Sequence, residues 1–169
     1  MTKLADQMKS LWADNFCVRI KAHGYHINLT GSDFPAYHKF LDDIYSTLND
    51  YVDRLGEGIR TLEEVVPASL GRLNQLCTIK DATVVPDECD IIKELYADVE
   101  VLKESAIKAF DFCNSERRYG LQNILADYLE DMEKICWMLR ATMEDPRVEA
   151  AEMAAEKKLG IPEEPTPKI

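Results

Sequence analysis

Two histidines and three carboxylates between residues 24 and 60 are the side chains of this chain best suited to bind a metal ion. The histidines are His26 and His38, and the carboxylates are Asp42, Asp53 and Glu57. Imidazole nitrogens combined with carboxylate oxygens make a hard, oxygen-rich ligand set. Such a set suits iron or manganese better than structural zinc, whose closed sites are rich in thiolates.

The spacing of these residues predicts that one chain holds only half of each metal site. Residues 32–62 are predicted to form one helix, because apolar residues recur there every three or four positions. At about 100° per residue, four of the ligands share a stripe roughly 150° from the apolar one. They form two pairs, His38 with Asp42 and Asp53 with Glu57, and roughly 16 Å of helix rise separates the pairs. The apolar positions are Tyr37, Leu41, Ile44, Leu48, Tyr51, Leu55 and Leu62.

A second copy of the same helix would complete the sites. One metal ion with ligand bonds of about 2 Å cannot reach both pairs on a straight helix. If two copies pack antiparallel about a two-fold axis, the pairs face each other and two identical sites form between subunits. His26 would join His38, because an antiparallel hairpin brings the end of the preceding helix alongside it. Spacing alone leaves one alternative open, which is a polar face that only meets solvent.

The same residues carry a resemblance to a known family. The segment HINLTGSDF (residues 26–34), followed by a second histidine twelve residues after the first, resembles the Dps-type miniferritins, the DNA-binding proteins from starved cells. Their pattern is HWN-x-x-G-x-x-F, then His, an acid four residues later, and D-x-x-x-E. Residues 134–141 are similar to the family's K-x-x-W-M-L-R-A segment, and the resemblance spans roughly residues 10 to 143. The matching positions in the first pattern are His26, Gly31, Phe34, His38, Asp42, Asp53 and Glu57.

The resemblance implies a ferroxidase with a two-iron site between subunits, in which these five side chains are both metal ligands and catalytic residues. His26 of one subunit, with Asp53 and Glu57 of its mate, would hold the tighter iron, and Glu57 would bridge. His38 and Asp42 would hold, or hydrogen-bond, the weaker second site. Family members oxidise Fe(II), commonly with hydrogen peroxide, and store ferric mineral inside a hollow dodecamer.

Two positions depart from the family pattern. Ile27 stands where the family has a tryptophan. A role of that ring in electron supply or radical quenching is therefore not expected to carry over to this chain. Gly56 and Gly58 flank Glu57, where the family has A-E-R. Because each glycine in a helix interior costs about 1 kcal/mol relative to alanine, the pair indicates a close backbone approach.

The helical pattern predicts an all-α, ferritin-like four-helix bundle over residues 1–145. Short loops join antiparallel neighbours, whereas a long crossover between the second and third helices lets those two run parallel. Residues 146–169 are expected to form a C-terminal extension, helical over 147–158 and then Pro-rich. The other expected limits are helices at 3–28, 32–62, 87–113 and 121–139, a crossover at 67–86 with a short helix at 69–77, and a turn at 114–115.

A metal site at the centre of the bundle is not expected. Ordinary di-iron bundles use Glu-x-x-His pairs on facing helices. The sequence contains no such pair, and the third and fourth predicted helices contain no histidine. His23, one turn before His26, is interpreted as a surface group or a neighbour of the ligands.

The charge balance argues against nucleic acid as a partner. The chain has 31 acidic and 20 basic side chains, a formal net charge of −11. Binding to phosphates depends on Lys and Arg, so DNA binding is expected to be weak or absent. The chain shows no signal peptide and no apolar run long enough to span a membrane. Five cysteines without a C-x-x-C pair indicate reduced thiols in a cytoplasmic protein.

Three functions fit these observations to different degrees. The first is a ferroxidase and iron store, a homo-oligomer and by resemblance a dodecamer, that uses Fe(II) with hydrogen peroxide or dioxygen. The second is a structural or nucleoid-associated shell of the same fold that protects DNA with little oxidase activity. The third is a plain helical bundle whose polar stripe meets solvent or an unrelated partner. The ligand spacing and the resemblance together favour the first.

Overall fold

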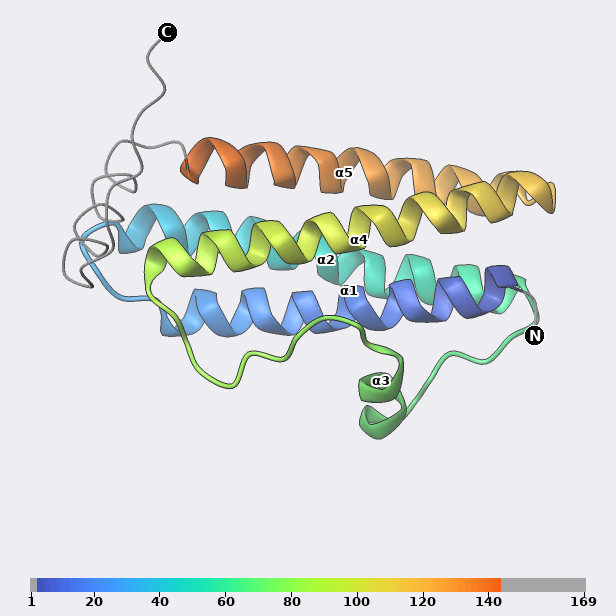
Figure 1. Ribbon diagram of the computed structural model, residues 1–169, viewed down its shortest axis with the longest axis horizontal. Helices are drawn as coiled ribbons and strands as arrows, with labels where there is room; N and C mark the ends of the chain where they lie inside the picture. Colours follow the sequence, from blue (N-terminus) through green and yellow to red (C-terminus); the bar gives the residue numbers. More distant parts are fainter. Residues whose placement is uncertain (1–2, 144–169) are drawn as a thin grey trace, which may run out of the picture.

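Four long helices lie side by side, and a fifth, short helix lies in the connection between the second and third of them (Figure 1). The computed structural model describes residues 3–143, and within this range all regular structure is helical. The all-α, ferritin-like bundle with a short helix in its crossover is therefore confirmed. The extension predicted over 146–169 lies outside the described residues. The helices are α1 (Lys3–Asn28), α2 (Phe34–Thr61), α3 (Leu70–Leu76), α4 (Glu88–Ser115) and α5 (Tyr119–Met143).

The connections decide which helices run in the same direction. Short turns make α1 and α2 one antiparallel pair and α4 and α5 another, whereas the crossover over residues 62–87 makes α2 and α4 parallel (Figure 1). The two pairs pack through α1 against α4 and through α2 against α5. The short helix α3 rests on α1. This is the arrangement predicted from the length of the crossover.

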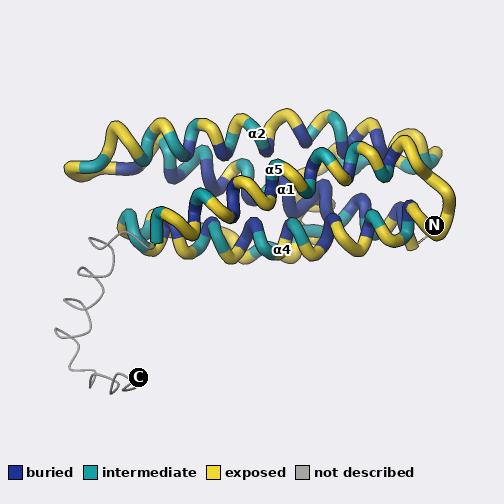
Figure 2. Tube along the Cα trace, turned by 90° about the horizontal axis from the view of Figure 1, so that it is seen from above, coloured by how far each residue is buried: buried dark blue, intermediate teal, exposed yellow. Residues whose placement is uncertain are grey.

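The apolar stripe of α2 faces the bundle interior. Figure 2 shows buried residues turned toward the neighbouring helices and exposed residues on the outside. Leu41, Ile44, Leu48 and Leu55 are each fully buried, and burying one such side chain contributes about 1.5–3 kcal/mol. Within residues 3–143, no helix combines the length and the apolar composition that crossing a membrane requires.

Two predicted boundaries were wrong by a few residues. Asp33, not Ser32, stands at the N-terminus of α2, and its carbonyl oxygen accepts the first helical hydrogen bonds, from Ala36 and Tyr37. The turn expected at residues 114–115 lies at 116–118, because α4 continues to Ser115. Arg117 takes the left-handed conformation (φ 57°) that usually belongs to glycine after a helix, so the sequence carried no glycine signal for this end.

Candidate metal centre

The imidazole rings of His26 and His38 each hydrogen-bond to the backbone of the other residue. The Nδ1 atom of His26 lies 2.8 Å from the carbonyl oxygen of His38, and the Nδ1 atom of His38 lies 3.0 Å from the carbonyl oxygen of His26. The two rings stack with centroids 3.7 Å apart. Because a carbonyl oxygen only accepts, both Nδ1 atoms must carry the proton. In the neutral imidazole this tautomer leaves the lone pair on Nε2, the state in which imidazole binds a metal.

The turn between α1 and α2 brings these two histidines together. Gly31 has φ +130°, a conformation that other residues rarely adopt. A Cβ atom on Gly31 would also come within about 2.2 Å of the Glu88 carboxylate of α4, so the position has no room for a side chain. Three residues later, the Phe34 ring stacks on His38 with centroids 4.8 Å apart. The segment that resembles the family pattern thus has a direct role in placing the imidazoles.

Asp42 lies near the histidines and already has two partners. It hydrogen-bonds to the Tyr45 phenol and, at 3.2 Å, to the Lys39 ammonium, and these contacts lower the pKa of its carboxyl. The Tyr45 ring lies 5.1 Å from the His26 ring and 4.5 Å from the His23 ring. His23 is therefore close to the ligands, as interpreted from its position.

Lys39 and Tyr45 both contact Asp42, and neither was predicted from the sequence. Tyr45 is the one of the two that the sequence could have revealed. Its position carried the signal, because it stands three residues after Asp42 and seven after His38, on the same face of the helix. Its ring and hydroxyl connect a predicted carboxylate ligand with a predicted imidazole ligand.

Asp53 and Glu57 are not brought to the histidines within one chain. Both side chains are exposed on the outer face of α2, and among the described residues neither makes a hydrogen bond or an ion pair. Within residues 3–143, no three His, Cys, Asp or Glu side chains converge as a metal site requires. One chain therefore presents two separate half-sets, His26 with His38 and Asp42, and Asp53 with Glu57.

The glycines beside Glu57 permit close packing on the inner face of α2. A Cβ atom on Gly58 would lie 2.7 Å from Leu121 of α5, and one on Gly56 would lie 3.4 Å from the Trp12 indole of α1. The close approach indicated by the sequence is thus an approach of the bundle's own side chains. It fixes the rotation of α2 so that Glu57 points outward.

The bundle interior contains acids, but a lysine already pairs with two of them. Lys21 of α1 places its ammonium 2.9 Å from Glu94 and 2.8 Å from Asp98, both on α4. The Tyr25 hydroxyl also donates to Glu94 at 2.6 Å. Burial raises the pKa of Glu94, but the hydrogen bonds from Tyr25 and Lys21 outweigh it and lower that pKa. These carboxylates are engaged by an internal cation instead of being available to a metal.

Comparisons with known proteins place this fold in a family. A model of the ferritin-like domain matches residues 5–148. The DNA protection during starvation protein of Helicobacter pylori is 29% identical over 140 residues, which cover 82% of this chain and 97% of that protein. A low temperature-induced protein of Nostoc is 29% identical over 139 residues, covering 81% of this chain and 78% of that protein.

Solved structures agree with the sequence comparisons. The Dps protein of Vibrio cholerae, described as a member of a broad superfamily of ferritin-like diiron-carboxylate proteins, superposes with a TM-score of 0.81 at 26% identity. That match covers 84% of this chain and 89% of the other. Antigen TpF1 of Treponema pallidum has the same fold, with a TM-score of 0.80 at 24% identity, over 83% of this chain and 91% of the other. The chain therefore belongs to the ferritin-like family, and the relatives and solved structures that it resembles include Dps proteins.

Proposed function

We propose that this protein is a Dps-like ferroxidase, which oxidises Fe(II) with hydrogen peroxide and stores the ferric product inside a hollow oligomer, predicted to be a dodecamer. The observation that carries the proposal is the reciprocal hydrogen bonding of His26 and His38. It fixes both rings in the tautomer that leaves Nε2 free for a metal. Nothing in a purely solvent-exposed face would require two imidazoles to be ordered in this way.

The iron site is proposed to form only between two subunits. In each site, His26, His38 and Asp42 of one chain would meet Asp53 and Glu57 of a second copy packed antiparallel across a two-fold axis. On α2, the half-buried His38 and Asp42 and the exposed Asp53 and Glu57 stand toward opposite ends of one face, which is the arrangement such packing needs. Iron is here the substrate, and the five side chains bind and orient it. Their ligand chemistry, two imidazoles and three carboxylates, suits iron better than zinc.

The proposed reaction transfers two electrons at once. Two Fe(II) ions and one hydrogen peroxide, with two protons, give two Fe(III) ions and two water molecules. Binding two ferrous ions in one site avoids the one-electron reduction of peroxide that releases hydroxyl radical. The net charge of −11 favours the accumulation of cations near the protein.

The first prediction tests two of the five proposed ligands by kinetics. Fe(II) is added without oxygen to the assembled protein, peroxide follows, and ferric absorbance is recorded by stopped flow. We expect Glu57→Ala and His26→Ala each to slow oxidation at least about tenfold, because each removes a ligand. Asp43→Asn is the matched control, since Asp43 is an exposed neighbour of Asp42 outside the ligand stripe, and it should retain the wild-type rate.

Oligomer mass, measured by light scattering on each variant, separates lost ligands from lost assembly. Slow oxidation in assembled Glu57→Ala supports a shared site. Wild-type protein that oxidises iron no faster than Glu57→Ala would exclude the ferroxidase function. A stable monomer would exclude the shared site, because no second copy would then supply Asp53 and Glu57.

The alternative function is a shell that protects DNA with little oxidase activity. The name of the Helicobacter pylori relative favours it, whereas the acidic charge of this chain opposes it. An electrophoretic shift assay with assembled protein and duplex DNA at physiological salt decides between them. We expect no shift at micromolar protein, and a shift together with slow iron oxidation would establish the alternative.

A further inference from the structure

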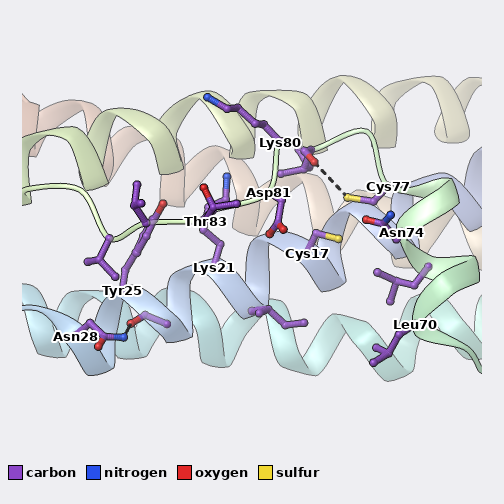
Figure 3. A pocket seen from close by; sticks show the side chains of 17 residues that line it. Cys17, Lys21, Tyr25, Asn28, Leu70, Asn74, Cys77, Lys80, Asp81 and Thr83 are labelled. Carbon is purple, nitrogen blue, oxygen red and sulfur yellow. Dashed lines mark hydrogen bonds between the residues drawn. The ribbon is translucent and has the colours of Figure 1, made fainter.

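Cys17 and Cys77 lie side by side although sixty residues separate them in the sequence. Cys17 belongs to α1, and Cys77 ends α3 in the crossover. The thiols lie close enough that each shifts the pKa of the other, and Figure 3 shows both sulfur atoms in the gap between α1 and the end of α3. Neither thiol is part of a disulfide. The fold thus brings together two thiols whose proximity no sequence motif predicts.

Other contacts hold the two cysteines in place without help from the thiols. The residue after Cys77, Thr78, donates its backbone N–H and its hydroxyl to the two oxygens of Asp14, and Asp14 stands one turn before Cys17 on α1. On the other side of Cys77, Leu73 is 8% exposed and packs in the core. The crossover is therefore fastened to α1 on both sides of Cys77. The thiols meet because the backbone brings them together.

The pair lines a cavity that small molecules can enter. The cavity has a volume of about 510 Å³ and lies between α1, α3 and residues 79–85 of the crossover. Asp81 contributes a polar group to its wall (Figure 3). Ile20 contributes an apolar surface. Both cysteines are partly exposed. A molecule the size of hydrogen peroxide can therefore reach the sulfur atoms.

We propose that Cys17 and Cys77 form a reversible disulfide within one chain, which fastens the crossover to α1 when the protein meets a peroxide. The step oxidises two thiols and reduces one peroxide. The Cys17 sulfur attacks a peroxide oxygen, the O–O bond breaks, and a sulfenic acid forms with release of water. The Cys77 sulfur then attacks the Cys17 sulfur, which forms the S–S bond and releases a second water. A thiol reductant reverses the reaction.

The surroundings favour a disulfide over a bound soft metal ion. Burial raises the pKa of Cys17, Asp14 and Asp81 add to that rise, and burial also raises the pKa of Cys77. A metal held by two thiolates would place negative charge among these acids, whereas a disulfide is neutral. The same environment keeps the thiolate fraction small, so the disulfide is expected to form slowly and to last.

A peptide map of the oxidised protein tests the pairing directly. Assembled, iron-free protein is treated with hydrogen peroxide, blocked with iodoacetamide, and cleaved with trypsin without reduction. Cleavage after Lys9, Arg19, Arg72 and Lys80 places the two cysteines in separate peptides, residues 10–19 and 73–80. We expect one cross-linked species of these two peptides, the loss of two of the five free thiols per chain, and recovery of both with dithiothreitol. Thiols that stay free, or oxidise only to sulfinic acids, would overturn the proposal.

Thermal stability tests the consequence of the bond. A disulfide that closes a loop of this length restricts the unfolded chain, so oxidation should raise the Tm of the wild-type protein by at least about 5 °C. Cys77→Ser should abolish that rise. Cys89→Ser is the matched control, because Cys89 is a partly exposed cysteine outside the pair, and it should show the full rise. A rise that persists in Cys77→Ser, or cross-links between different chains, would contradict the pairing.

Discussion

Two lysines of this chain each lie between two carboxylates, and only one of the two is buried. Lys21 of α1 reaches Glu94 and Asp98 in the bundle interior, and its side chain is 4% exposed. Lys39, in the first turns of α2, reaches Asp42 and Asp43 on the outer face, and its side chain is 68% exposed. The same chemical arrangement therefore occurs once in the core and once at the candidate metal centre.

The difference in burial decides what each bridge can do. Removing one partner of a buried bridge leaves a charge without compensation and costs about 3–5 kcal/mol. An exposed bridge is worth about 0–1 kcal/mol, so its partners separate easily. Asp42 can thus leave Lys39 at little cost, as the proposed iron site requires, whereas Glu94 and Asp98 are committed to Lys21. The interior acids are thus engaged by a lysine, whereas the acids of the proposed iron site stand on the outer face of α2.

The largest expected effect comes from removing the buried ammonium. Lys21→Met should lower the free energy of unfolding by about 3 kcal/mol, because Glu94 and Asp98 then face each other in a poorly solvated place. Lys39→Met, the exposed counterpart, should change it by less than about 0.5 kcal/mol. Urea unfolding of both variants at pH 7, followed by circular dichroism, measures the two values. Equal losses would show that burial does not distinguish the two bridges.

The second effect concerns the exposed side of the comparison. Tyr45→Phe removes the hydroxyl that hydrogen-bonds to Asp42 while it retains the ring beside His26. A carboxylate that loses this hydrogen bond is held less firmly in position, so we expect Fe(II) to bind about three- to tenfold more weakly. Anaerobic titration calorimetry with Fe(II) measures the affinity, and urea unfolding should show little change. Tyr119→Phe, on an exposed tyrosine at the start of α5, serves as the control, and an affinity in Tyr45→Phe equal to that of this control would remove Tyr45 from the centre.

The fold was predictable because its signals are local and repeated. The stripe through Leu41, Ile44, Leu48 and Leu55 indicated the inner face of α2, and each of these side chains is fully buried. Ser69 and Asp87 stand where a helix begins, and both side chains accept a backbone N–H of the following turn. The end of α4 was not predicted correctly, because Arg117 takes a left-handed conformation that is not typical of arginine.

The candidate centre was predictable only in part. Spacing on α2 put His38 and Asp42 on one face, and the hairpin brought His26 to them. Spacing could not reveal that Asp42 is engaged by Tyr45 and Lys39, because a helix face with several polar residues permits many pairings. The buried bridge of Lys21 was missed for a different reason. It joins residues 73 and 77 positions apart, and no periodicity within one helix reports a contact between two helices.

The smallest expected effect refines the buried side of the comparison through pH. The pKa of Glu94 in the folded protein lies below its ordinary value of 4.5, so its charge stabilises the fold above about pH 4.5 and ceases to do so as the pH falls through the folded pKa. Glu94→Gln keeps one acceptor oxygen where the carboxylate offers one to Lys21 and one to Tyr25, and Lys21 retains Asp98, so at pH 7 it should cost about 1 kcal/mol. That cost should vanish toward pH 3. Asp98 acts in the opposite sense, because burial raises its pKa and the nearby charge of Glu94 adds to that rise. The difference between the two proteins therefore reports Glu94 together with its effect on Asp98. Urea unfolding midpoints of both proteins, measured from pH 7 to pH 3, follow this difference in stability. A difference that grows on acidification would mean that the charge of Glu94 is not what stabilises its contact with Lys21.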